Sequence, residues 1–189
     1  MASQTIPYIT PEEYLAAERE AECKSEYYDG QVYAMSGGTR WHSVIAVNLL
    51  RELSTALRGR CEVHGSDMRL SVSATNAYTY PDVTVICGTP EFTGRGEDIL
   101  LNPTLIVEVL SKSTERYDRR AKFLHYQTIQ SLREYLLVSQ YKRRVDLCTR
   151  LNEKDWRIES LDHTSGRVHL SSVGVELTFD QIYAGVNLA

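Results

Sequence analysis

Two short apolar segments of the chain each contain one acidic residue, and this pattern constrains the fold more than any other. Residues 80–87 read YPDVTVIC and residues 104–110 read TLIVEVL, and each has the length of a buried strand. Asp82 lies near the start of the first segment and Glu108 lies in the middle of the second. An ionised carboxylate buried without a partner costs several kcal/mol, so each acid needs a lysine, another cation or a metal ion. The segments therefore predict a sheet with charged groups inside it.

The two acids have two alternative uses. On neighbouring strands, Asp82 and Glu108 can together hold a hard divalent cation, because such ions prefer oxygen ligands. Alternatively, each acid pairs with an arginine at the end of the sheet, and both acids are then structural. The residues alone leave both interpretations open.

A lysine is the next group to look for beside such a pair of acids. The usual nuclease arrangement places it two residues after the second acid, on the same face of the strand. Leu110 occupies that position here. Lys112 lies four residues after Glu108, which is about 13 Å along an extended strand and too far for one site.

Lys122 is the better candidate for this lysine. It lies in a helix that the sequence predicts over residues 117–127, and this helix can fold back over the sheet. We expect the buried side of the helix to include Leu124 and Tyr126. Asp118 and Tyr126 lie four residues on either side of Lys122 and share its face. The alternative is an exposed ion pair between Asp118 and Lys122.

Local patterns elsewhere predict a mixed α/β chain. Thr10 and Glu13 form a capping box at a helix start, and Asp29-Gly30 predicts a tight hairpin turn. Residues 88–103 read as a long surface loop, and the short strands that follow favour a mostly antiparallel sheet. The expected helices cover about residues 10–23, 42–58, 117–127 and 180–184. Further expected strands are 32–34, 61–64, 69–73, 134–139, 144–149, 156–161 and 168–170.

Composition excludes several classes of protein. The chain has 189 residues and is 42% hydrophobic, which suits one folded domain over residues 1–189 and excludes a disordered or fibrous chain. A net charge of −4 argues against a protein that coats nucleic acid non-specifically. The four cysteines contain no CxxC pair, which argues against a disulfide scaffold or a zinc ribbon. The five histidines contain no pair at metal-binding spacing, so we expect none of them to be a ligand.

The location and the cofactors follow from what the sequence lacks. No apolar run approaches the roughly 18 to 20 residues of a membrane span. The opening segment has neither a basic nor an apolar stretch of a secretory signal. No glycine-rich nucleotide-binding motif is present. We therefore expect a cytoplasmic protein with no membrane partner and no organic cofactor.

A series of short motifs occurs in a fixed order along most of the chain. They are EYYDG at 26–30, Trp41-His42, YPDV at 80–83, VEVLSKST at 107–114, ERYD at 115–118, Lys122, Tyr126 and SLREY at 131–135. Together these motifs resemble the Uma-type family of restriction-endonuclease-like proteins, which belongs to the PD-(D/E)xK nuclease superfamily. The resemblance spans about residues 10–150.

The resemblance implies a fold and a set of site residues. The fold is an α/β (α+β) restriction-endonuclease-like core, with a central mixed sheet flanked by helices. By position in the motifs, Asp82 is the first acid and Glu108 is the second acid. Lys122 is the lysine, which has moved from the strand to a helix, although Lys112 stays a possible alternative. Glu26 is an additional acid near the metal.

The resemblance also implies a function. The expected activity is hydrolysis of phosphodiester bonds in DNA, with Mg²⁺ or Mn²⁺ held by Asp82, Glu108 and Glu26, and with a homodimer as the assembly. Arg116 and Arg120 would contact substrate phosphates. The competing hypothesis is a catalytically inactive module that binds nucleic acid or protein on the same fold. A third hypothesis is a metal-free structural protein.

Overall fold

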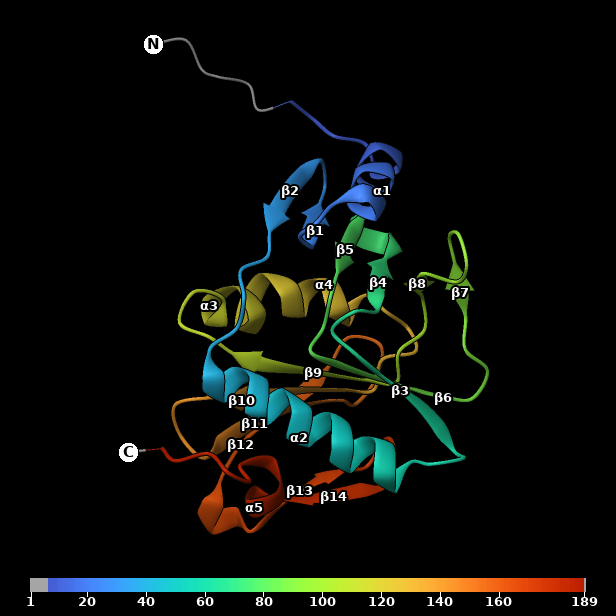
Figure 1. Cartoon of the computed structure of the whole chain (residues 1–189). Coiled ribbons are helices and arrows are strands. Elements are labelled where there is room, and N and C mark those ends of the chain that lie inside the picture. The colour runs from blue at the N-terminus through green and yellow to red at the C-terminus, as the bar shows by residue number, and fades with distance from the viewer. Residues whose placement is uncertain (1–6, 189) are drawn as a thin grey trace.

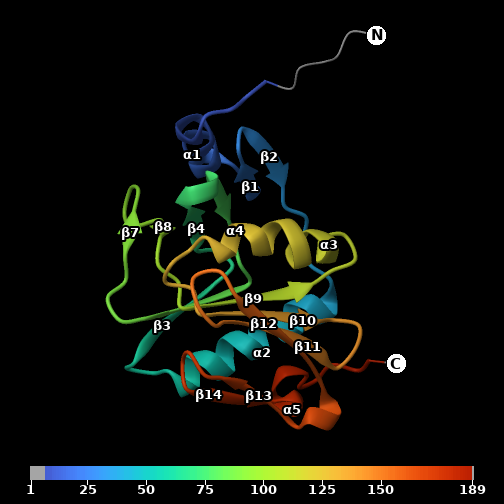
Figure 2. The ribbon, with the colours of Figure 1, turned by 180° about the vertical axis from the view of Figure 1, so that it is seen from behind.

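Two six-stranded sheets organise the chain, which a computed structural model describes from residue 7 to residue 188. The limits of the expected domain, residues 1 and 189, and the first part of the opening segment lie outside the described residues. Viewed from either side, the sheets form an upper and a lower layer with helices between and below them (Figures 1 and 2). The expected mixed α/β architecture, a sheet flanked by helices, is therefore present.

The lower sheet is mixed and contains both acid-bearing segments. Its strand order is β12 (Trp156–Asp162), β11 (Arg144–Arg150), β10 (Glu134–Ser139), β9 (Leu105–Leu110), β6 (Val83–Cys87) and β3 (Cys61–Gly65). The neighbours β9 and β10 run parallel, and the other pairs are antiparallel. All six residues of β9 are buried. Glu108 therefore lies in the interior, as its apolar neighbours predicted.

Helix α2 (Arg40–Ala56) covers the lower face of this sheet. Its buried residues Ile45, Leu49 and Leu53 repeat at helical spacing and pack against valines of β6 and β9. The small ladder of β13 (Arg167–Leu170) and β14 (Val175–Thr178) and helix α5 (Phe179–Ile182) join the same apolar cluster.

A helical segment covers the upper face of the lower sheet. It consists of α3 (Glu115–Tyr117), a π-helical turn (Asp118–Lys122) and α4 (Phe123–Gln127). Phe123 and Tyr126 pack against Ile106 and Leu110 of β9. The expectation that Leu124 is buried was wrong, since its side chain is 63% exposed. Phe123 and Tyr126 lie three residues apart and share one face of α4, whereas Leu124 lies about 100° further round a regular helix and points outward.

The upper sheet lies on the other side of this helical segment. Its order is β2 (Gln31–Ala34), β1 (Ser25–Tyr28), β5 (Ala77–Thr79), β4 (Arg69–Val72), β8 (Ile99–Leu100) and β7 (Phe92–Thr93). Helix α1 (Pro11–Glu20) begins at the predicted capping box and lies beside this sheet (Figure 1). Short 3₁₀ turns occur at Ser73–Thr75 and His163–Ser165.

Three local features differ from the sequence-based expectation. Residues 88–103 are not only a loop, because they contain β7 and β8. Strands β5 and β14 were not expected. These strands have only two to four residues each, which is too few to produce a clear alternation of apolar and polar residues.

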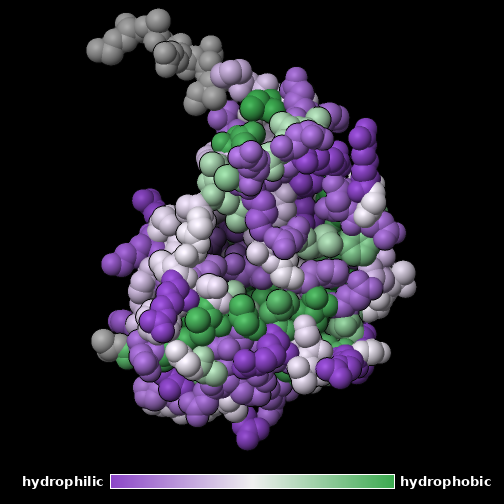
Figure 3. All heavy atoms as spheres, viewed as in Figure 1, coloured by the Kyte–Doolittle hydropathy of each residue, from purple (hydrophilic) through white to green (hydrophobic). Residues whose placement is uncertain are grey.

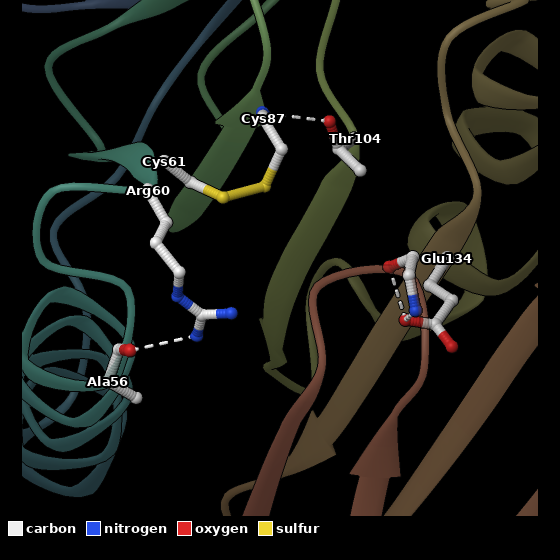
Figure 4. The surroundings of a disulfide bond; sticks show 7 residues. Ala56, Arg60, Cys61, Cys87, Thr104 and Glu134 are labelled. Atoms are coloured by element: carbon white, nitrogen blue, oxygen red, sulfur yellow. Dashed lines mark hydrogen bonds between the residues drawn. A yellow bond between two sulfur atoms is a disulfide. The ribbon is translucent and has the colours of Figure 1, made fainter.

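A disulfide bond joins Cys61 of β3 to Cys87 of β6 (Figure 4). The two residues lie directly opposite each other in the antiparallel register, and the Cys87 N–H donates to Oγ1 of Thr104 at 3.0 Å. Cys23 and Cys148 are free, so the chain is no disulfide scaffold, but the single bond was not predicted. Partners 26 residues apart have no local motif, and only the strand register brings them together.

Candidate active site

The two strand acids lie next to each other across the β6–β9 pair. Val83 is paired with Val107, so Asp82, one residue before β6, comes opposite Glu108 on the same face. Oδ2 of Asp82 accepts the backbone N–H of Val109 at 2.7 Å. Two acids that are far apart in sequence therefore lie at one position of the sheet.

Lys122 links these acids to a third strand, β1. Its side chain is buried, and Nζ lies 2.8 Å from Oε1 of Glu108 and 2.9 Å from Oε1 of Glu26 in β1. Glu26 belongs to the upper sheet, Glu108 to the lower sheet and Lys122 to the helical segment between them. The structure thus brings together three of the residues that the motifs selected.

Neither strand acid pairs with an arginine among the described residues. Oε1 of Glu108 contacts Lys122 and accepts a hydrogen bond from the Tyr126 hydroxyl at 3.1 Å. Oδ2 of Asp82 contacts Nε2 of His42 at 3.3 Å. The hypothesis of arginine-paired structural acids is therefore wrong.

Asp118 is also part of the site. Its Oδ1 lies 3.8 Å from Nζ of Lys122, and the two residues are only 3% and 4% exposed. The expected alternative of an exposed Asp118–Lys122 ion pair is therefore wrong. The π turn that contains both residues places them and Tyr126 toward the sheet, and such turns are frequent at functional sites.

The site contains more carboxylates than cationic side chains. Burial is the largest effect on Glu108 and raises its pKa, Lys122 opposes this, and the charges of Asp118, Asp82 and Glu26 raise it further. Burial alone would lower the pKa of Lys122, but the charge of Glu108 and the other acids raises it well above its ordinary value. Three carboxylates, those of Glu26, Glu108 and Asp118, lie 2.8 to 3.8 Å from Nζ of Lys122, so the site attracts further positive charge.

His42 is the residue that sequence reasoning missed. It lies in the first turn of α2, where the Thr39 side chain accepts its backbone N–H. The hydrogen bond to Asp82 raises the pKa of His42. Inspection of histidine spacing could not find it, because its partner is an acid in another element. The only signal was its place in the Trp41-His42 motif.

The donor set fits a hard cation held by two carboxylates. Within residues 7–188, no three His, Cys, Asp or Glu side chains form a group that could hold a metal ion. Magnesium usually takes one or two protein carboxylates, and waters and phosphate oxygens complete its coordination. The contacts of Asp82 and Glu108 all use one oxygen of each carboxylate, Oδ2 and Oε1, which leaves Oδ1 and Oε2 for an ion.

The arginines near the site divide into two groups. Arg119 binds Glu115 and Asp146 and is occupied within the fold. Arg116 and Arg120 are exposed and have no acidic partner in the described part of the chain. Hydrophilic residues fill the surface between the upper layer and α2, although an apolar band crosses α2, where Val47 is exposed (Figure 3).

None of the helices in residues 7–188 is long and apolar enough to cross a membrane.

Two proteins of one organism match nearly the whole chain in sequence. An uncharacterised protein of Synechocystis sp., slr1290, is 40% identical over 185 residues, which cover 97% of this chain and 96% of that protein. A second uncharacterised protein of the same organism, sll1609, is 36% identical over 172 residues and covers 90% of this chain and 97% of its own length.

A solved structure has the same fold. It is described as a putative nuclease belonging to DUF820 from Anabaena variabilis. The TM-score is 0.77, and the match covers 95% of this chain and 99% of that chain. The sequences are 19% identical, so the likeness concerns the fold. Residues 11–180 match the Uma2 family, whose description is "Putative restriction endonuclease", and the chain therefore belongs to that family.

Proposed function

We propose that this protein is a metal-dependent endonuclease that hydrolyses phosphodiester bonds in DNA. The observation that carries the proposal is the buried Lys122 ammonium, which contacts Glu108 and Glu26 beside Asp82. A buried lysine among several acids, with one oxygen free on each strand acid, is a suitable arrangement for phosphoryl chemistry. The family description and the nuclease-like fold support the same reaction class.

In this proposal Asp82 and Glu108 hold Mg²⁺ or Mn²⁺, and Glu26 lies beside the ion. When bound, the ion polarises the phosphate and lowers the pKa of a water molecule. Lys122 orients the attacking water and offsets negative charge in the transition state. Arg116 and Arg120, which are exposed at the start of the helical segment, contact phosphates of the substrate.

An inactive binding module is the second candidate. The observation in its favour is that Lys122 already makes close contacts to two carboxylates and is 4% exposed. A lysine held in this way can serve as a structural counter-ion without any turnover. The two candidates differ in whether divalent ions bind and whether DNA is cut.

We also propose a homodimer and a cytoplasmic location. Strand β12 is an edge strand, and its Ile158 is 60% exposed, so this edge offers a surface for a second copy. In the cytoplasm the Cys61–Cys87 pair would be reduced for much of the time, because thiols are kept reduced there. Small-angle scattering over a concentration series tests the dimer, and a scattering mass that stays monomeric at high concentration would contradict it.

The test of the activity uses purified protein, Mg²⁺ or Mn²⁺, and both plasmid and single-stranded DNA. We expect cleavage by the wild type, and we expect Asp82→Asn to lose both ion binding and cleavage while it keeps its fold. Asp155→Asn, an exposed change of the same type, is the matched control and should behave as the wild type. Absence of cleavage in every metal and salt condition, with no ion binding by calorimetry, would leave the binding module as the function.

A further inference from the structure

Three exposed cations at one end of the lower sheet have no acidic partner among residues 7–188. They are Arg40 at the start of α2, Lys112 after β9 and Lys142 after β10, and we call them the basic rim. The neighbouring Arg143 and Arg144 differ, because they pair with Asp180 and Asp146. An unpaired surface cation keeps its full charge for a ligand.

The three segments that carry the basic rim are held together by hydrogen bonds. Gln140 is buried, and its Nε2 donates to the carbonyl of Leu110 at 2.8 Å. Its Oε1 accepts from the hydroxyl of Thr39. The backbone N–H of Lys112 donates to the Tyr141 hydroxyl at 3.1 Å. The rim is therefore built on a fixed frame and not on three independent loops.

Aromatic rings orient two of the three cations. The Arg40 guanidinium lies 4.3 Å from the centre of the Trp41 ring, and Nζ of Lys112 lies 5.7 Å from the centre of the Tyr141 ring. A cation–π contact holds the side chain without neutralising its charge. Both cations are thereby positioned for an anion.

The surface around Lys142 is hollowed on two sides. Hollows of about 490 Å³ and 690 Å³ meet at the turn that contains Tyr141 and Lys142, and both residues line each hollow. Two acids line the first hollow, Glu115 and Asp146, but both bind Arg119. The acids of the first hollow are thus compensated by Arg119. Asp162 lines the second hollow and accepts hydrogen bonds from Thr164, so an anion beside Lys142 is favoured in the first hollow.

The rim is adjacent to the candidate active site along the chain. Lys112 follows the strand that carries Glu108, and Arg40 lies two residues before His42. Lys112 lies in the turn after β9, and among the described residues neither Lys112 nor Arg40 contacts Asp82 or Glu108. A cation at this place therefore does not act on the reacting phosphate. It is well placed for the phosphates on either side of it.

We propose that the basic rim binds the phosphate backbone of a nucleic-acid strand next to the bond that the active site attacks. This inference rests on the proposed function, which it deepens by naming a second contact surface for the substrate. A chain with net charge −4 needs a local cationic surface to hold a polyanion. The rim provides one on a rigid frame beside the acids.

The test measures the salt dependence of binding, in EDTA so that no cleavage occurs. The probes are a fluorescein-labelled DNA duplex and the matching single strand, read by anisotropy. The rim variant carries Arg40→Gln, Lys112→Gln and Lys142→Gln. The control variant carries Arg58→Gln, Arg95→Gln and Lys154→Gln, which removes three exposed cations elsewhere and keeps the net charge matched. Thermal melting verifies that both variants are folded.

For the duplex, the slope of log K against log salt is negative. We expect its magnitude to decrease by about 2 to 3 in the rim variant and to stay unchanged in the control. Equal slopes for the two variants would overturn the proposal. So would a wild type that binds neither probe at low salt, or equally strong competition by poly-glutamate. A wild type that shows the slope change but never cuts DNA supports the rim and contradicts the endonuclease. If the wild type cuts DNA but the rim variant has the same salt slope as the wild type, the endonuclease is supported and the rim is contradicted.

Discussion

Nζ of Lys122 lies 2.8 Å from Oε1 of Glu108, and the two residues come from a helical turn and a strand. On the strand itself, the position two residues after Glu108 belongs to Leu110, which packs in the apolar cluster with Ile106 and Tyr126. The lysine thus reaches Glu108 from above the sheet, and the strand position two residues further on stays apolar.

Replacing Lys122 should lower the rate of DNA cleavage without weakening the binding of divalent ions. We expect Lys122→Ala to keep divalent binding by calorimetry and to lower the cleavage rate by about 10² to 10³, because the proposed role of the ammonium is in the transition state. The same change leaves Glu108 buried without its cation, and removal of one partner of a buried pair costs about 3 to 5 kcal/mol of unfolding free energy.

A paired variant controls for that loss of stability. Glu108→Gln combined with Lys122→Met removes both charges of that pair, so we expect denaturation in urea to show part of the stability restored. The rest stays lost, because Glu26 and Asp118 still lack their cation, and we expect no cleavage because Glu108 no longer binds the ion. Lys154→Ala, at an exposed position, should change neither property. Full cleavage by Lys122→Ala would remove the lysine from the mechanism.

His42 should act on the ion through Asp82. Its Nε2 contacts Oδ2 of Asp82, so the ring helps to orient the carboxylate without touching the ion. We expect His42→Ala to weaken divalent affinity about 10- to 100-fold, as is usual for partners of metal ligands. Calorimetry with Mn²⁺ measures this, and His163→Ala, an exposed histidine, is the control. Unchanged affinity in His42→Ala would show that Asp82 needs no such support.

Asp146 should make stability depend on pH in acid. Burial alone would raise the pKa of Asp146, but hydrogen bonds from Ser160 and Arg119 outweigh it and lower the pKa below its ordinary value. A group whose folded pKa is lowered stabilises the protein above its unfolded pKa of roughly 3.9, and that stability is lost as the pH falls through the folded pKa.

We therefore expect Asp146→Asn to cost about 1 to 3 kcal/mol at pH 7, because Arg119 loses a charged partner. The difference from the wild type should shrink below about pH 4, where the wild-type carboxyl takes up its proton. Urea denaturation of both proteins over this pH range measures it. A difference that is constant with pH would contradict the assignment.

The Cys61–Cys87 bond should stabilise the edge of the lower sheet. A bond that closes a loop of 26 residues contributes about 3.5 kcal/mol if chain entropy is the main term. We expect dithiothreitol, or Cys61→Ser with Cys87→Ser, to lower the midpoint of urea denaturation, while Cys23→Ser has no effect, since Cys23 is exposed and free. Alkylation of the denatured protein followed by mass spectrometry should find four reactive thiols only after reduction, and four before reduction would contradict the bond.

The parts of the fold that rest on local chemistry were predictable from the sequence. The capping box at Thr10 and the turn at Asp29-Gly30 formed where they were expected, and Gly30 has a φ of 87° that suits glycine. The apolar strand around Glu108 also formed over nearly the predicted range. In these places the local residues alone determine the backbone.

The contacts that depend on register and layering were not predictable in the same way. His42 meets Asp82, and Cys61 meets Cys87, only after distant strands and helices have packed. The π turn at Asp118 has no local sequence signature, so its place in the helical segment could not be foreseen. Glu26 and Lys122 were selected by their motifs, and their contact required the upper sheet to lie over the helical segment.

The site is divided among three layers, with Glu26 in one sheet, Asp82 and Glu108 at the other, and Lys122 in the segment between. Its geometry therefore exists only while the layers are docked, and a sub-global opening that leaves both sheets intact would already separate the lysine from its acids. The cleavage activity therefore reports the docking of the layers more sensitively than the content of secondary structure does. On heating, cleavage should disappear before the circular dichroism of the sheets does.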